Sequence, residues 1–429
     1  MSSTGKPQLL QGVLAIHKPI GISSAQVLRD VEEHFNPSAL FRPLLDAERA
    51  AVAQEKSQKG SQYRRKRGPN RTQRVKLGHG GTLDPLATGV LIAGVGSGTK
   101  ALGRYLGGCQ KTYESAVLFG CAADTYDNTG KIMGRAPHAH VTREAVEKAL
   151  DAFKGDIMQK PPVYSAIKFN GKKAYEIMRE GGAPPKMEER PVTVYKLELV
   201  DWFEPGTHSW RYPKEEMEAT KEEKEAALKA SAPNAKAEDA AAAATAAGEK
   251  RKRDEGGDSA EEIPEKKTKT EVGAEQPADA TTVDETKDAS AKAPTEEESA
   301  ATLSEDGANA PAALIRMTVS SGFYVRTLCH DLGAAVGSLA CMTSLVRTEQ
   351  GDFELGKNVL EYEDLQAGED VWGPKVKTLL EEWTARQQKE QKAEQPAQAR
   401  PKSPEKRERS NSPVKTMKEA KEDDVPEMD

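Results

Sequence analysis

Short apolar runs separated by turn residues predict several β-strands in this chain. The runs occupy residues 13–16, 90–95, 113–119 and 314–319, each bounded by glycine, proline or charged residues. Residues 192–200 alternate instead between apolar and charged positions. This alternation predicts a half-buried strand on which Tyr195, Leu197 and Leu199 share one face.

Two other segments have helical spacing. Ser23 or Ser24 is expected to cap a helix whose apolar residues recur on one face, at Val27, Leu28, Val31 and Phe35. A second helix is expected from Thr142, with Val146, Ala149, Leu150 and Phe153 on its apolar side. Strands and helices mixed in this way, with short spacers, predict an α/β-type (α+β) fold with a mixed, largely antiparallel sheet flanked by helices.

The apolar pattern stops in two long segments. No aromatic residue occurs between Tyr212 and Phe323, where Ala, Glu, Lys, Asp and Thr dominate. Such a composition cannot bury enough apolar surface to offset the entropy of ordering, which predicts a disordered acidic insertion at 206–310. The insertion divides one folded domain into residues 12–205 and 311–383. Residues 384–429 are expected to form a disordered, charged tail with two Ser-Pro pairs.

The overall charge of the chain hides a strong asymmetry. The net charge is −6, which by itself argues against binding to nucleic acid, but the acidic excess is concentrated in the insertion. The remainder is basic enough to bind a polyanion. Residues 36–76 break the helical pattern and are expected to form a basic loop, with most of its charge at 64–76. Its role is open between a solvated loop, a nuclear-import signal and a clamp on RNA phosphates.

Several function classes find no support in the sequence. The four cysteines have no CxxC spacing and the seven histidines form no cluster, so no metal site is expected. No apolar run reaches the roughly 20 residues of a membrane helix, and no membrane association is expected. The N-terminus has neither a signal-peptide core nor a clear mitochondrial presequence. Residues 94–100 are rich in glycine but lack the order of a phosphate-binding loop.

Residues 78–91 hold the strongest candidate for chemistry. Asp84 lies in a glycine-rich turn, Pro85 restricts the chain directly after it, and an apolar run follows. A turn of this kind presents a carboxylate rigidly, as a catalytic group requires. The alternative is an Asx-type turn in which Asp84 only caps its own loop.

The motif at 78–91 resembles the catalytic motif of the TruB family of pseudouridine synthases. Further segments resemble other motifs of this family: 12–24, 111–114, 124–130, 161–168, 171–176, 321–328 and 345–347. The long insertion and the basic loop are most similar to the eukaryotic, fungal-type members that act on uridine 55 of tRNA. The resemblance implies a pseudouridine synthase fold, and the charged tail leaves no room for the PUA domain that other members carry.

The same resemblance implies residue roles. Asp84 corresponds to the nucleophile, although removal of the 2′-proton is an open alternative, and Arg326 to a partner that can hold its carboxylate through two nitrogens. Tyr113 corresponds to the tyrosine that stacks on the base and assists loss of the C5 proton. The implied substrate-binding residues are His79, which inserts into the RNA loop, Tyr324 and Leu345, which line the pocket, and Lys168, a phosphate contact. For both tyrosines, ordinary core packing is the alternative.

The function implied is isomerisation of uridine 55 in the tRNA T-loop, which needs no cofactor because it involves neither redox chemistry nor a group donor. The T-arm of tRNA is the expected partner, with no guide RNA, and the protein is expected to be a monomer. The basic clusters predict a nuclear location, and a mitochondrial one is left open. Two rivals are a guide-dependent rRNA enzyme and a non-catalytic tRNA-binding protein.

Overall fold

The computed structural model describes residues 9–59, 74–231 and 305–394. Its contacts divide the chain into residues 1–384 and 385–429, and of the second unit only the end of a long helix is described. No helix in the described ranges is long and apolar enough to cross a membrane. The account below therefore concerns the first unit.

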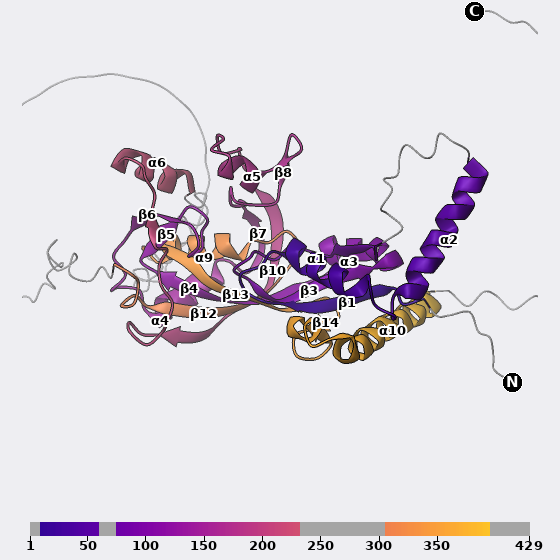
Figure 1. Cartoon of the computed structure of the whole chain (residues 1–429). Coiled ribbons are helices and arrows are strands. Elements are labelled where there is room, and N and C mark those ends of the chain that lie inside the picture. The colour runs from indigo at the N-terminus through magenta and orange to yellow at the C-terminus, as the bar shows by residue number, and fades with distance from the viewer. Residues whose placement is uncertain (1–8, 60–73, 232–304, 395–429) are drawn as a thin grey trace, which may run out of the picture. The chain divides into compact units, whose positions relative to one another are not determined.

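A mixed sheet of ten strands forms its centre (Figure 1). The strands are β1 (Gly12–Lys18), β2 (Leu77–His79), β3 (Thr88–Val95), β4 (Lys111–Phe119), β7 (Gly155–Gln159), β10 (Arg190–Phe203), β12 (Ala312–Val319), β13 (Ala340–Gln350), β14 (Phe353–Glu354) and β15 (Val359–Glu361). Their order is β15-β1-β3-β13-β4-β12-β10-β7, with β2 beside β3 and β14 beside β13. Two pairings, β1 with β15 and β3 with β13, are parallel, and the rest are antiparallel. The predicted fold class is confirmed.

Helices and two small sheets surround this sheet. The helices are α1 (Ser24–Phe35), α2 (Arg42–Lys59), α3 (Leu102–Gly107), α4 (Arg143–Asp151), α5 (Ala174–Arg179), α6 (Lys221–Ser231), α9 (Val325–Ala335) and α10 (Glu369–Glu394), with 3-10 turns η2 (Gly96–Lys100) and η3 (Tyr362–Leu365). One small sheet has the order β11 (Glu215–Glu216), β6 (Lys131–Arg135), β5 (Cys121–Ala123), and the other pairs β8 (Lys168–Phe169) with β9 (Lys172–Lys173). Figure 1 shows the α5–β8 part and the α6–β6 part as two separate projections on the same side of the sheet.

The core follows from alternation along β1. Leu14 and Ile16 pack in one cluster with the apolar face of α1 and with Trp372 of α10, whereas Val13 and Ala15 belong to a second cluster with α3. Phe35 at the end of α1 lies 5.1 Å from Trp372, ring centre to ring centre. Both predicted helices form, and their predicted caps, Ser23 and Thr142, accept backbone hydrogen bonds. Both faces of β1 are therefore covered.

The predicted face of β10 is wrong at Tyr195. Its side chain is 50% exposed, while Val192, Val194 and Leu197 are buried. The pairing with β12 shifts register between Val194 and Lys196. This β-bulge adds one residue to the strand, so the inward face changes from even-numbered to odd-numbered positions and Tyr195 turns outward.

Three predicted boundaries also need correction. The basic loop expected at 36–76 contains α2, which forms because Phe41, Leu44 and Leu45 are buried against the core. Most of its basic residues lie outside the described residues. The insertion expected at 206–310 is ordered at both ends: β11 pairs with β6, α6 follows, and Tyr212 donates a 2.5 Å hydrogen bond to the Phe119 carbonyl. Residues 232–304 lie outside the described residues. The tail expected from 384 begins later, because α10 continues to Glu394.

Gly89 holds the 78–91 motif against β13. Its φ is +100°, and a Cβ atom there would lie 2.2 Å from the carbonyl oxygen of Arg347. We expect Gly89→Ala to lower the free energy of unfolding by at least about 3 kcal/mol, because the backbone cannot move away without breaking the β3–β13 pairing. Urea unfolding would measure this. In the control Gly103→Ala, the new methyl group meets nothing within 4 Å. We expect that change to be neutral or stabilising by up to about 1 kcal/mol; equal effects of the two changes would contradict the argument.

Candidate active site

The turn that carries Asp84 is fixed from the N-terminal end of α1. Ser24 Oγ accepts a 2.9 Å hydrogen bond from the Leu83 amide and donates a 3.0 Å bond to the Leu83 carbonyl. The Gly21 amide donates to the Pro85 carbonyl over 2.8 Å. These bonds hold both sides of Asp84, so its position is set by β1, α1 and β3 together. Residues 12–24, which resemble another motif of the family, therefore position the turn of Asp84.

The buried side chain of Lys18 binds the same turn from inside the protein. Its side chain is fully buried, and its Nζ donates to the carbonyls of Pro19 (2.7 Å), Pro85 (3.2 Å) and Ala87 (2.7 Å). Burial lowers the pKa of Lys18 to about 8; the charge of Asp84 opposes this shift and that of Arg347 adds to it. The ammonium group therefore links Pro19 to residues 85–87, which directly follow Asp84, and it is near enough to the Asp84 carboxylate for that charge to act on it.

The shift of Lys18 predicts a pH dependence of stability. Because the pKa is lowered on folding, the unfolded chain holds a proton that the folded chain releases between about pH 8 and 10.5. The contribution of Lys18 to the free energy of unfolding then rises with pH in this window, by about 2 kcal/mol from pH 7 to 9.5. Urea unfolding of wild type and Lys18→Met at both pH values would measure it. A difference between the two proteins that stays constant with pH would contradict this prediction.

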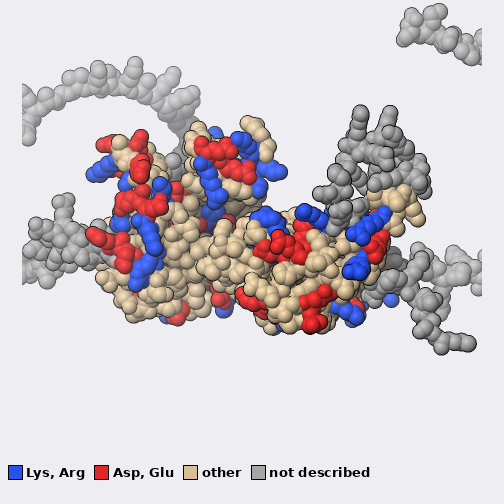
Figure 2. Space-filling model, in the orientation of Figure 1, with Lys and Arg blue, Asp and Glu red and all other residues tan. Residues whose placement is uncertain are grey.

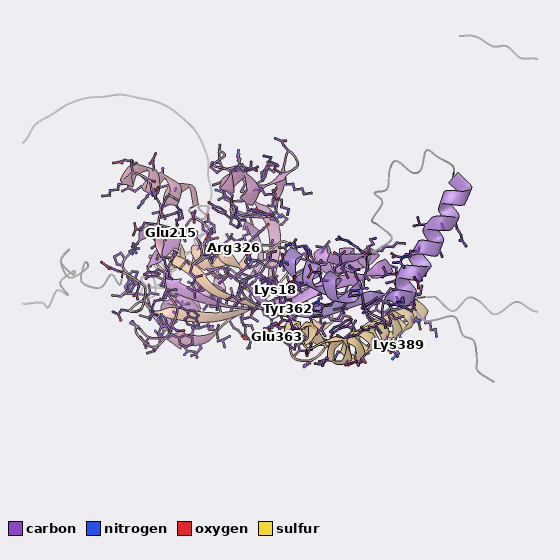
Figure 3. All side chains as sticks on the ribbon, viewed as in Figure 1. Lys18, Glu215, Arg326, Tyr362, Glu363 and Lys389 are labelled. Carbon is purple, nitrogen blue, oxygen red and sulfur yellow. The ribbon has the colours of Figure 1, made fainter. Side chains whose placement is uncertain are left out.

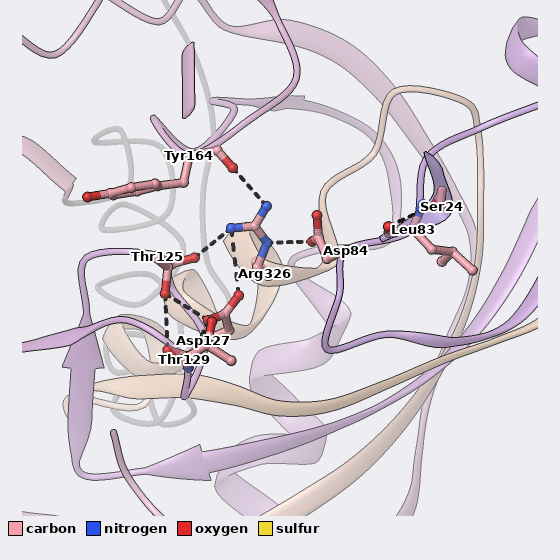
Figure 4. A network of polar contacts seen from close by, with 8 residues as sticks. All are labelled: Ser24, Leu83, Asp84, Thr125, Asp127, Thr129, Tyr164 and Arg326. Atoms are coloured by element: carbon pink, nitrogen blue, oxygen red, sulfur yellow. Dashed lines mark hydrogen bonds and ion pairs between the residues drawn. The ribbon is translucent and has the colours of Figure 1, made fainter. Parts of the chain in front are cut away.

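Arg326, in the first turn of α9, connects Asp84 to two other chain segments (Figure 4). Its Nε lies 2.9 Å from Asp84 Oδ2, and its Nη1 and Nη2 donate to the carbonyls of Thr125 (2.8 Å) and Tyr164 (3.0 Å). The Arg326 side chain is 7% exposed and that of Asp84 36% exposed. The structure brings the two predicted residues together, but only Nε contacts Asp84, because the two terminal nitrogens donate to carbonyl groups. The Asp84 carboxylate thus binds Arg326, which differs from the alternative in which it only caps its own loop.

Asp127 is a second carboxylate beside Arg326 that the sequence analysis gave no role. Its Oδ2 lies 3.8 Å from Arg326 Nη1. Its Oδ1 accepts from the hydroxyls of Thr125 (2.7 Å) and Thr129 (2.6 Å) and from the Thr129 amide (3.0 Å). The Asp-x-Thr spacing, typical of an Asx turn, is the signal that could have marked it. Asp127 orders the 124–130 loop and keeps the buried guanidinium compensated.

The predicted pocket residues differ in how close they come to this pair. Tyr324 is the N-cap residue of α9, and the Gln159 side chain accepts from its backbone amide (2.7 Å) and donates to its carbonyl (3.0 Å). Burial raises the pKa of the Tyr324 phenol, which is near enough to Asp84 and Arg326 for both charges to act on it. Tyr113 is 8% exposed on β4, and Leu345 is 7% exposed on β13. These two strands are neighbours in the sheet, with Tyr113 opposite Arg347.

The two predicted RNA contacts lie further out. His79 is half-buried on β2, and burial lowers its pKa, with smaller contributions from the charges of Arg347 and Lys173. Lys168 is exposed on β8, paired with Lys173 of β9. The structure gives neither residue a contact with Asp84. Figure 2 shows that Lys and Arg side chains on the α5 and α6 projections are mixed with Asp and Glu. This face is therefore not uniformly basic.

Two family models match the chain at these residues. The N-terminal domain of the TruB family of pseudouridylate synthases matches residues 67–218, which include Asp84, and the C-terminal domain of tRNA pseudouridylate synthase B matches 326–382, which begin at Arg326. The tRNA pseudouridine synthase 4 of Schizosaccharomyces pombe is 37% identical over 364 residues, 83% of each chain. The chain belongs to the TruB family. This confirms the family and the fungal type predicted from the motifs.

A second fungal relative covers a similar share of the chain. The tRNA pseudouridine synthase 4 of Saccharomyces cerevisiae is 31% identical over 379 residues, which cover 87% of this chain and 85% of the relative. Among solved structures, a Cbf5-Nop10-Gar1 complex matches with 17% identity and a TM-score of 0.40, over 86% of this chain and 59% of the other. The described ranges contain no group of three or more His, Cys, Asp or Glu side chains placed to hold a metal ion.

Proposed function

We propose that this chain is a tRNA pseudouridine synthase that isomerises uridine 55 in the T-loop, with Asp84 acting at the ribose. One observation supports this above the others: the Asp84 carboxylate is partly open to solvent while its partner, Arg326, is buried and fixed by two carbonyls. An anion held from behind and open in front is what attack on a flipped nucleotide requires. The relatives named tRNA pseudouridine synthase 4 supply the substrate class.

The reaction exchanges one bond of the base for another. The bond between N1 and C1′ breaks, the uracil turns within the pocket, and a bond forms between C5 and C1′. The C5 proton is lost and N1 gains a proton, so the product is an isomer of the substrate. Asp84 attacks C1′ or removes the 2′-proton, and both routes need the ionised carboxylate that Arg326 stabilises. Because no redox step or group donor takes part, the proposal includes no cofactor.

The remaining predicted residues take roles around this step. Tyr113 stacks on the base and assists removal of the C5 proton, and Tyr324 and Leu345 enclose the uracil. His79 occupies the space left by the flipped nucleotide, whose unstacking costs a few kcal/mol. Lys168 contacts a phosphate. We further propose that the protein acts as a monomer without a guide RNA, in the nucleus, with a mitochondrial role left open.

Tritium release tests the proposal. Full-length protein is incubated with a tRNA transcript that carries tritium at C5 of its uridines. The positions of pseudouridine in the product RNA are then determined by sequencing. We expect release from one uridine, at position 55, and none from a transcript with cytidine at that position. Release that persists in the cytidine transcript would refute the position. Binding of the transcript without any release would favour the non-catalytic tRNA-binding protein.

A further inference from the structure

A cavity of about 550 Å³ lies next to the candidate active site, and the mechanism above makes no use of it. It is bounded by the 124–131 loop, by Tyr164 and Arg179, and by residues 211–215 at the start of the predicted insertion. The volume is within the range of small-ligand sites. Since 211–215 contribute to its wall, the ordered beginning of the insertion is part of this cavity.

Two residues connect the cavity with the pair formed by Asp84 and Arg326. Thr125 and Tyr164 line the cavity, and their carbonyls accept the hydrogen bonds from Arg326. Figure 4 shows the Tyr164 ring directed away from Asp84, on the other side of the guanidinium. Figure 3 likewise shows Arg326 between Lys18 and the cavity residue Glu215 in this view. Arg326 therefore links the cavity to Asp84, because its guanidinium contacts Asp84 and two residues of the cavity wall.

The cavity has more positive than negative side chains. Its cations are Lys131, Arg179, Arg211 and Lys214, and its carboxylates are Asp124 and Glu215. Lys131 pairs with Glu215 (3.6 Å), and Arg211 with Asp306 (3.2 Å). In the ranges that the structure describes, Arg179 and Lys214 have no carboxylate partner. Two uncompensated cations at one cavity favour an anionic ligand.

Its polar and aromatic groups narrow the ligand further. Asn128 and Thr129 contribute uncharged polar residues to the wall. The ring of Tyr164 offers a flat surface, and its hydroxyl donates to Asp124 Oδ2 over 3.2 Å. An anionic group together with a planar ring that can stack on Tyr164 describes a nucleotide.

We propose that this cavity binds a nucleotide of the RNA strand adjacent to the target uridine. Its phosphate is bound by Arg179 and Lys214, and its base stacks on Tyr164. This inference rests on the proposed function and assigns the substrate a second binding site. Because Thr125 and Tyr164 also hold Arg326, an occupied cavity stabilises the orientation of the guanidinium toward Asp84. A free mononucleotide has the same chemistry, and the test separates the two sources.

The test compares two full-length double variants with wild type. Arg179→Ala/Lys214→Ala removes the unpaired cations of the cavity. Lys221→Ala/Lys377→Ala removes two exposed lysines elsewhere, with the same change in charge. Affinity for unmodified tRNA transcript is measured over a series of salt concentrations. We expect the cavity variant to bind about tenfold more weakly and its slope of log K against log salt to fall by about 0.7 to 1.4, as for one or two phosphate contacts on a single strand. The control should keep the slope of wild type.

Two results would overturn the inference. One is a cavity variant whose tRNA affinity and slope match those of the control. The other is calorimetric binding of uridine monophosphate that the cavity variant loses while its tRNA slope is unchanged, which would assign the cavity to a free nucleotide. Failure of the proposed function is separate, because it appears as absence of tritium release by wild type. Normal release together with an unchanged slope would refute only the second binding site.

Discussion

Asp84→Asn is expected to abolish tritium release from labelled tRNA, with a fall in rate of at least about 10⁴-fold. The amide keeps the size and much of the hydrogen bonding of the carboxylate but has no negative charge to attack C1′ or remove a proton. The turn that carries it is held by Ser24 and Lys18 through backbone groups, which the substitution leaves unchanged. Binding of tRNA should therefore stay within about threefold of wild type.

Asp370→Asn is the matched control, because Asp370 is exposed in the first turn of α10. Its activity should equal that of wild type. Release by Asp84→Asn above about 1% of the wild-type rate would exclude Asp84 as the reacting group. Loss of tRNA binding together with activity would instead show that the carboxylate serves the fold, and circular dichroism melting of both variants would confirm that reading.

Arg326→Lys has the second largest expected effect. The guanidinium contacts Asp84 through Nε and donates to the carbonyls of Thr125 and Tyr164 through its other two nitrogens. The lysine side chain is shorter and ends in a single ammonium group, which cannot bind the Asp84 carboxylate and both carbonyls at once. At least one buried carbonyl therefore loses its donor. We expect the free energy of unfolding to fall by about 2 to 4 kcal/mol and the rate at saturating tRNA to fall by about 10²-fold or more.

Arg316→Lys provides the comparison for this change. Arg316 makes an ion pair with Glu114 (2.6 Å) and another with Glu198 (3.3 Å), but its side chain is 45% exposed. Replacement at such a site is expected to change stability by less than about 1 kcal/mol and activity not at all. If Arg326→Lys lowers stability while the rate at saturating tRNA stays at the wild-type value, the prediction is contradicted. The guanidinium would then stabilise the fold without positioning the Asp84 carboxylate for the reaction.

Five strands, β1, β3, β4, β10 and β12, were predictable because their apolar or alternating runs are bounded by turn residues, whereas β13 and the shorter strands were not predicted. What sequence spacing could not give was the bulge at Tyr195, since an extra residue in a strand depends on its partner, β12. Likewise α2 was missed because its buried residues, such as Leu44, lie only at its beginning and a polar sequence follows. A sequence pattern describes one chain segment, whereas the bulge and α2 each depend on contacts with a second segment.

The candidate site divides in the same way. The motif around Asp84 carries its own signal, and the resemblance to a known family supplied Arg326. The carbonyl of Tyr164 has no such signal, and the Asp-x-Thr spacing marks only a turn at Asp127, because both groups act through contacts with a guanidinium far along the chain. The cavity is the clearest case: the 124–131 loop, Tyr164, Arg179 and residues 211–215 form it only after folding.

The order of strands has a consequence for the newly made protein. Both neighbours of β4 in the sheet, β12 and β13, follow residues 232–304 in the sequence, and Arg347 of β13 binds Val90, 257 positions earlier. At ordinary rates of translation those intervening residues take on the order of ten seconds to make. During that time β4 emerges without either partner, and Asp84 exists without Arg326. The turn that carries Asp84 is thus synthesised first, and its pair with Arg326 can form only after the last quarter of the chain has begun to be made.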